Sequence, residues 1–146
     1  MKRYIIGQEV VEWVAKQTNE HGNFGCAVGI GIEHDGKIIA GVVYNEFNGV
    51  NMNMHVASDG SAKWLDRKFL WMAFDYPFNQ AKVKRITGLV GEGNKAARSF
   101  DEHVGFRLET TLKDAHPTGD LLIYVMTRDD CRWLSLGSRY AQGTDS

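Results

Sequence analysis

Two short turns rich in small residues carry the most suggestive chemistry in this 146-residue sequence. They cover residues 57–62 and 91–94, and each lies between an apolar segment typical of a strand and a segment with helical spacing. The start of a helix has unpaired N–H groups and a partial positive charge, which bind anions such as phosphate. The turns therefore favour a pyrophosphate site, although an ordinary loop and a helix N-cap at Asn94 explain the same residues.

A cluster of basic residues surrounds the second turn. Lysine and arginine side chains there would attract the phosphate groups of a ligand. A solvated rim of the protein explains the same residues equally well. The cluster consists of Lys82, Lys84, Arg85, Lys95 and Arg98.

Apolar periodicity predicts the elements that position these turns. The pair Asp35-Gly36 between two alternating segments predicts a β-hairpin, and Asn48-Gly49 predicts a second turn into a third strand. Pro77 is expected to end or distort the helix before it. Helices are expected at 7–18, 61–76 and 94–104, and strands at 26–32, 38–44, 50–56, 85–90, 106–112 and 121–127.

This order predicts an α/β (α+β) fold with a mixed, mostly antiparallel central sheet flanked by helices. The strands at 50–56 and 85–90 flank the crossover between the antiparallel half and the βαβ-like half. Neighbouring strands can diverge at such a crossover and leave a crevice at their carboxyl ends. Since the two turns follow these two strands, both turns are expected at the crevice.

Composition limits the classes of protein to which the chain could belong. Its length and an apolar fraction of 43% predict a single domain over 1–136, followed by a flexible polar tail over 137–146. The net charge of −1 argues against nucleic-acid or acidic-membrane partners. With no long apolar run and no signal sequence, a cytoplasmic protein with reduced cysteines is expected. The histidines and cysteines show no metal-ligand spacing, so no metal is expected.

One stretch of the chain resembles a known family. Residues 94–97 (NKAA) and 105–109 (GFRLE) resemble the Asn-x-x-Ala…Gly-Phe-x-x-Glu signature of the GNAT superfamily of N-acetyltransferases. Residues 74–78 and 83–86 resemble the ribosomal-protein-acetylating branch, and 126–134 are similar to the ends of small phage-type members. The expected order of elements also matches the GNAT fold along most of the chain.

The resemblance implies an acyltransferase that moves an acetyl group from acetyl-CoA to a primary amine, on a protein N-terminus, a lysine or a small molecule. The pantetheine arm would enter a V-shaped opening between the strands at 50–56 and 85–90 and pair with them like an added strand. The pyrophosphate would lie on the turn after the first strand. The expected cofactor-binding residues are Val56, Ala57, Ser58, Gly60, Ser61, Ala62, Lys63, Trp64, Asn94, Lys95, Ala97 and Arg98.

Two features depart from the family's pattern. The glycines of its turn align with Ala62 and Trp64, and the tyrosine that protonates the leaving thiolate aligns with Asp101. An ionised aspartate cannot donate a proton, so that role is expected to be empty or filled by another residue. The alternative function is therefore a GNAT-fold module that binds CoA or a partner protein with little or no turnover.

A base that helps to deprotonate the attacking amine completes the expected site. His55 is the first candidate, since it ends the polar face of the strand at 50–56 and imidazole titrates near neutral pH. Glu46 is the second candidate, and Tyr44 and Tyr124 are candidate replacement acids. Each has an ordinary alternative explanation, such as a solvated carboxylate or a half-buried strand tyrosine. Exposed aromatic residues near Trp133 could seal a homodimer.

Overall fold

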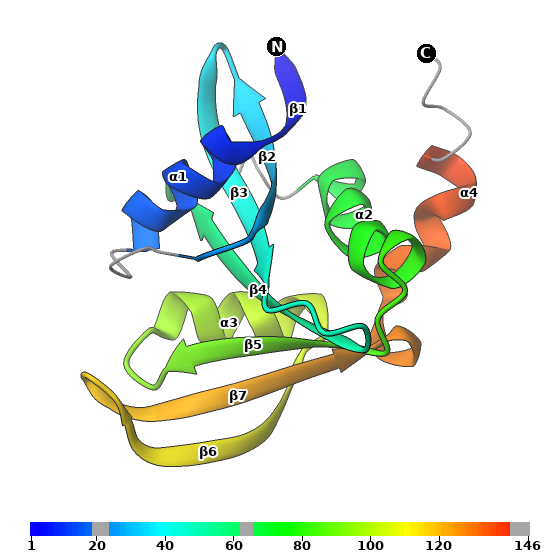
Figure 1. The fold of residues 1–146 in the computed structure, drawn as a ribbon. Helices are drawn as coiled ribbons and strands as arrows, with labels where there is room; N and C mark the ends of the chain where they lie inside the picture. The colour runs from blue at the N-terminus through cyan, green and yellow to red at the C-terminus, as the bar shows by residue number, and fades with distance from the viewer. Residues whose placement is uncertain (19–23, 62–65, 141–146) are drawn as a thin grey trace.

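A computed structural model describes residues 1–18, 24–61 and 66–140 of the chain (Figure 1). Its centre is a seven-stranded sheet in the order β1-β2-β3-β4-β5-β7-β6. The strands are β1 (Lys2–Ile6), β2 (Val28–His34), β3 (Lys37–Asn45), β4 (Asn51–Ser58), β5 (Arg85–Gly91), β6 (Arg107–His116) and β7 (Gly119–Thr127). The helices are α1 (Gln8–Thr18), α2 (Arg67–Asp75), α3 (Lys95–Val104) and α4 (Gly137–Tyr140), with shorter helical turns over Tyr76–Gln80, Arg128–Asp130 and Arg132–Leu136.

The sheet is mixed and mostly antiparallel, which confirms the predicted fold class. Each neighbouring pair of strands is antiparallel except β4 and β5, which run parallel and are joined by a crossover that contains α2. The edge strand β1 is missing from the prediction. Only Ile5 of its five residues is buried, so its sequence lacks the alternation that marks a half-buried strand.

Helix α1 packs directly on a row of glycines in the β2–β3 hairpin. A Cβ atom on Gly29 or Gly31 would lie 2.9 Å from a side-chain carbon of Val10. One on Gly41 would lie 2.8 Å from carbons of both Val10 and Val14. The small-residue face of the first predicted strand therefore lets α1 approach the sheet closely and bury its valines.

Helices α2 and α3 cover the opposite face and contribute to the larger hydrophobic core. Helix α2 begins later than predicted, because its N-cap is Asp66, whose Oδ1 accepts a hydrogen bond from the Phe69 N–H at 2.6 Å. The other carboxylate oxygen of Asp66 accepts a hydrogen bond from the Tyr4 hydroxyl, which ties the helix to β1. Pro77 distorts the helix instead of ending it, since the chain continues as a π-helical turn from Tyr76 to Gln80.

The first residues of the predicted tail, 137–140, are helical. They form α4, and the ring of Tyr140 lies 6.0 Å, centroid to centroid, from that of Trp71 in α2. Trp133 is half-buried, and its Nε1 donates a hydrogen bond to the Val104 carbonyl at 2.8 Å. This tryptophan packs within the chain, and a dimer contact through aromatic residues near it stays a prediction. Residues 141–146 of the predicted tail lie outside the described residues.

Three further features concern the described part of the chain as a whole. None of its helices has the length and apolar character needed to cross a membrane. Its histidine, cysteine, aspartate and glutamate side chains form no group of three or more that could hold a metal ion. Asp101 is its only buried charged residue.

Candidate functional site

The parallel strands β4 and β5 separate part-way along their length (Figure 1). Their last paired residues are Asn53 and Thr87, although β4 continues to Ser58 and β5 to Gly91. Beyond this pair β4 stays bonded to β3, and β5 stays bonded to β7. A V-shaped opening therefore lies where the sequence predicts a crevice, with its closed end at Asn53 and Thr87.

A cavity of about 320 Å³ fills this opening. Residues of β4, β5, α3 and the C-terminal end of α1 line it. Larger hollows exist elsewhere on the described surface, including one of about 690 Å³ between Phe78 and Asp129, but they do not lie between the separated strands. The smaller cavity, called the cleft from here on, is the candidate functional site. Two free strand edges face it, and such edges can bind an extended ligand.

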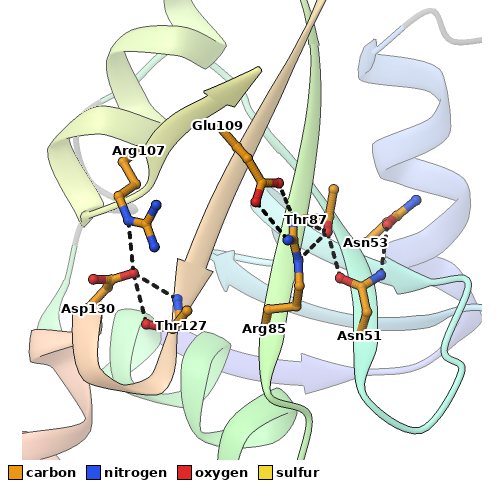
Figure 2. A network of polar contacts seen from close by, with 8 residues as sticks. All are labelled: Asn51, Asn53, Arg85, Thr87, Arg107, Glu109, Thr127 and Asp130. Atoms are coloured by element: carbon orange, nitrogen blue, oxygen red, sulfur yellow. Dashed lines mark hydrogen bonds and ion pairs between the residues drawn. The ribbon is translucent and has the colours of Figure 1, made fainter. Parts of the chain in front are cut away.

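A network of hydrogen bonds holds the closed end of the cleft together (Figure 2). The Thr87 hydroxyl donates to Oδ1 of Asn51 at 2.6 Å, and Nδ2 of Asn51 donates to Oδ1 of Asn53 at 3.5 Å. Arg85 donates to the Thr87 hydroxyl and forms a bidentate pair with Glu109 at 2.7 and 3.0 Å. Since Glu109 belongs to β6, the network joins β4, β5 and β6 across the sheet.

This network explains two features of the sequence. Glu109, the last residue of the family-like motif at 105–109, pairs with Arg85, and this hydrogen bond lowers the pKa of its carboxyl. Arg85 was predicted to attract CoA phosphates as part of the basic cluster. Its guanidinium instead bonds Glu109 and Thr87, so in this structure it links β5 to β6 within the sheet.

His55 lies on β4 and lines the cleft. Its Nε2 is 2.9 Å from Oδ1 of Asn45, and the Asn45 amide nitrogen donates to the Phe24 carbonyl at 3.1 Å. The amide oxygen can only accept, so Nε2 carries the proton and Nδ1 keeps a lone pair. Burial lowers the pKa of His55 to about 4. The imidazole is therefore neutral at neutral pH, but it is a weaker base than the sequence argument assumed.

Asp101 lines the cleft from α3. Its Oδ2 lies 3.2 Å from the position that a Cβ atom on Gly88 would occupy, and Gly88 is the first β5 residue beyond the closed end. Burial, with a smaller contribution from the Glu102 carboxylate, raises the pKa of Asp101 to about 7. Its surroundings therefore disfavour the charged form, whereas the sequence favours an ionised aspartate.

Comparison with known proteins identifies the fold. No protein-family model and no curated protein matches the sequence. Among solved structures, the chain is similar to a mutant of the spermidine N-acetyltransferase SpeG from Vibrio cholerae, with a TM-score of 0.69 and 16% identity over 92% of this chain and 95% of that one. It is also similar to the N-acetyltransferase PseH from Campylobacter jejuni in complex with acetyl coenzyme A, with a TM-score of 0.59 and 12% identity over 88% of this chain and 99% of that one.

The chain has the GNAT fold. A second SpeG mutant structure has a TM-score of 0.67 and 14% identity over 99% of both chains, so the likeness extends along the whole sequence. At these identities the likeness concerns the fold alone. The fold predicted from residues 94–97 and 105–109 is thus confirmed.

The GNAT fold brings five of the twelve expected cofactor-binding residues to the cleft. These are Val56, Ala57, Ser58, Asn94 and Ala97. Sequence reasoning did not assign the cleft-lining residues Leu89, Val90 and Ala96 to the cofactor site. Leu89 and Val90 end the strand expected at 85–90, and Ala96 lies in the first turn of the helix expected at 94–104, so these positions could have indicated them. The expected residues Ala62, Lys63 and Trp64 lie outside the described residues.

The first small-residue turn does not present its amides as predicted. The Gly60 N–H donates to the Ser58 hydroxyl at 3.2 Å, and the Ser61 N–H donates to Oδ1 of Asp59 at 2.9 Å. Neither Gly60 nor Ser61 lines the cleft. In this conformation the two amides stabilise the turn itself, so a bound pyrophosphate would need to replace these local contacts.

At the second turn, Asn94 is an N-cap as well as a cleft residue. Its Oδ1 accepts a hydrogen bond from the Ala97 N–H at 3.1 Å. Arg98 donates to the Glu92 carbonyl at 3.2 Å and also bonds the Tyr124 hydroxyl, and it does not line the cleft. Lys95 is exposed outside the cleft. Of the three polar residues expected here, only Asn94 meets the cavity.

The other candidate catalytic residues do not line the cleft. Glu46 is exposed in the loop after β3, in a left-handed backbone conformation. The Tyr124 hydroxyl donates to Glu102 at 2.8 Å on α3, and the buried Tyr44 hydroxyl donates to the Ala73 carbonyl. Burial raises the pKa of both tyrosines. The structure therefore brings together His55 and Asp101 and leaves these three residues outside.

Proposed function

We propose that the protein is an N-acetyltransferase that transfers the acetyl group of acetyl-CoA to a primary amine by direct attack in a ternary complex. The observation that carries the proposal is the open pair β4 and β5, whose edges face a cavity beyond Asn53 and Thr87. The similar PseH structure contains acetyl coenzyme A, and the similar SpeG proteins are named for acetylation of polyamines. These names support an amine acceptor in general.

The backbone of the cleft suits a pantetheine arm. The arm carries two amide groups, which can pair with the edges of β4 and β5 as an added strand would. A backbone N–H near Val56 would then stabilise the oxyanion that forms when the thioester carbonyl is attacked. Asn94, Ala96 and Ala97 at the start of α3 would lie along the arm, because they line the same cavity.

His55 remains the proposed partner of the attacking amine. Its Nδ1 lone pair can accept a hydrogen bond from the amine, while Asn45 holds the other ring nitrogen. The low basicity of the ring means that it orients the amine and passes the released proton onward without retaining it. The acceptor is a protein N-terminus, a lysine or a small polyamine. The described residues that line the cleft contain no cluster of charges that would select one of these over the others.

Thermal-shift titration and thiol release test the proposal together. We expect CoA and acetyl-CoA to raise the melting temperature of the full chain, since a ligand that binds only the folded state stabilises it by mass action. We also expect free thiol to accumulate with acetyl-CoA and at least one amine from a panel of spermidine, lysine and short peptides. An unchanged melting temperature at millimolar CoA would contradict the proposal.

A binding module without turnover is the second candidate, favoured by the aspartate at position 101 in place of a tyrosine. It predicts stabilisation by CoA with no thiol release across the same panel. Thiol release from acetyl-CoA that requires an amine and disappears in His55→Ala would exclude it.

A further inference from the structure

A buried carboxyl group that has no polar partner among the described residues lies beside the closed end of the cleft. Asp101 is 8% exposed, and no hydrogen bond or ion pair to its carboxyl occurs among the described residues. Burying such a group is costly unless it is paired or neutral. A carboxyl group that is buried, unpaired and directed at a cavity is therefore a candidate for chemistry rather than for stability.

The position of the carboxyl defines what it can reach. Oδ2 of Asp101 lies against the backbone of Gly88, one residue beyond the last paired residue Thr87. A Cβ atom at position 88 would lie 3.2 Å from this oxygen, which is tighter than an ordinary contact, so the glycine leaves room for the carboxyl beside the vertex of the opening. An extended arm that entered the cleft from its open side would bring its far end towards this vertex, where Asp101 lies.

We propose that Asp101 donates a proton to the sulfur of CoA as the thioester breaks. The inference rests on the proposed acetyltransferase function. The amine nitrogen forms a bond to the acetyl carbon, and the carbonyl electrons move to oxygen. When the carbonyl re-forms, the carbon–sulfur bond breaks, and the sulfur takes its electron pair and the proton of the Asp101 carboxyl. The proton that the nitrogen loses returns through solvent to the Asp101 carboxylate, so the products are the amide and free thiol.

The charged groups around Asp101 are compatible with this role. On α3 the Glu102 carboxylate opposes ionisation, while from β7 the Tyr124 hydroxyl is directed at Glu102 and also bonds Arg98. From β4 the cleft contains His55, which is neutral, and β5 contributes the apolar residues Leu89 and Val90. With its pKa at about 7, the carboxyl is protonated in a large fraction of molecules at neutral pH. A thiolate is more basic, with a thiol pKa near ~8.5, so the transfer is downhill.

The test compares Asp101→Asn with wild type in an amine-dependent thiol-release assay. Asparagine keeps the shape but has no acidic proton, so kcat should fall by about 10²-fold or more while the shift in melting temperature with CoA is retained. Asp101→Glu should recover part of the rate. Asp129→Asn, which removes an exposed carboxylate after β7, is the matched control and should leave kcat unchanged.

The pH profile distinguishes an acid from a base. With Asp101 as the acid, kcat of the wild type falls as pH rises through about 7, and Glu102→Gln moves this fall to lower pH. A wild-type kcat that rises through pH 7 would overturn the inference, as would full activity in Asp101→Asn. Wild-type protein that binds CoA without any thiol release would instead contradict the proposed function. The pH dependence of kcat in the wild type and in Glu102→Gln still tests the acid role of Asp101 if Asp101→Asn does not fold.

Discussion

Asn53 and Thr87 are the last paired residues of β4 and β5, and the cleft lies beyond them, lined from Met54 on β4 and from Leu89 on β5. The Thr87 side chain also bonds Asn51 and Arg85, so the same position ends the backbone pairing and anchors the side-chain network. The shape of the cleft therefore depends on a few hydrogen bonds at its closed end.

Thr87→Val tests this dependence. Valine has nearly the same shape but leaves Oδ1 of Asn51 without its donor, which should lower the free energy of unfolding by about 1–2 kcal/mol. CoA affinity should fall as well, because the vertex loosens. Thr111→Val on the exposed edge strand β6 is the control. Chemical denaturation and CoA titration measure both effects, and equal behaviour of the two variants would contradict the anchoring role.

His55 should make folding stability sensitive to mild acid. The folded state holds this pKa at about 4, below the ordinary value of 6.5. The unfolded chain therefore binds a proton first, and the stability present above pH 6.5 is lost as pH falls towards 4. In His55→Gln this part of the acid dependence should disappear. Melting temperatures from pH 7 to pH 4 would show it, and parallel curves for the two proteins would contradict the assigned burial.

Asp101 should have the opposite dependence on pH. Its folded pKa of about 7 lies above the ordinary value of 3.8, so its ionisation opposes folding. The stability it contributes is complete below pH 3.8 and is lost as pH rises through 7. Asp101→Asn should therefore be more stable than wild type at pH 8, by on the order of a few kcal/mol. Denaturant unfolding at pH 5 and pH 8 measures this, and a variant less stable than wild type at pH 8 would refute it.

Asn94 has two roles that substitutions can separate. Asn94→Ala removes the N-cap of α3 and should lower the free energy of unfolding by about 1 kcal/mol. Asn94→Ser keeps a capping oxygen and should restore stability. If Asn94 also binds the cofactor, CoA affinity stays reduced in the serine variant. If the serine variant recovers both stability and CoA affinity, Asn94 acts only as the helix cap and does not bind the cofactor through its amide.

The contact of α1 with the hairpin should tolerate no added volume. In Gly41→Ala the new methyl group would meet Val10 and Val14 at 2.8 Å, and such overpacking costs about 1–3 kcal/mol. A Cβ atom on Gly93 meets nothing within 4 Å, so Gly93→Ala is the matched control and should change stability little. Thermal unfolding of the two variants gives the comparison, and a fully stable Gly41→Ala would contradict the close packing.

The sequence alone determined the order of the elements and the place of the cleft. Alternation marked β2 to β5, the residues at 94–97 and 105–109 marked α3 and its ends, and the crossover between β4 and β5 predicted their divergence. These features follow from local spacing, because periodicity and turn residues act over a few neighbouring positions. The short edge strand β1 escaped prediction because only Ile5 of its residues is buried, so its sequence carries no alternation. The predicted start of α2 is too early, because the local cap bond from the Phe69 N–H to Asp66 sets it.

Only the tertiary structure decided the protonation of the two titratable residues that meet in the cleft. Burial lowers the pKa of the half-buried His55 beside Phe24, and burial raises the pKa of Asp101 against Gly88. The residue types alone suggested the reverse, a ready base at His55 and an ionised group at Asp101. Desolvation reverses both expectations, and it depends on which distant segments exclude water from each group.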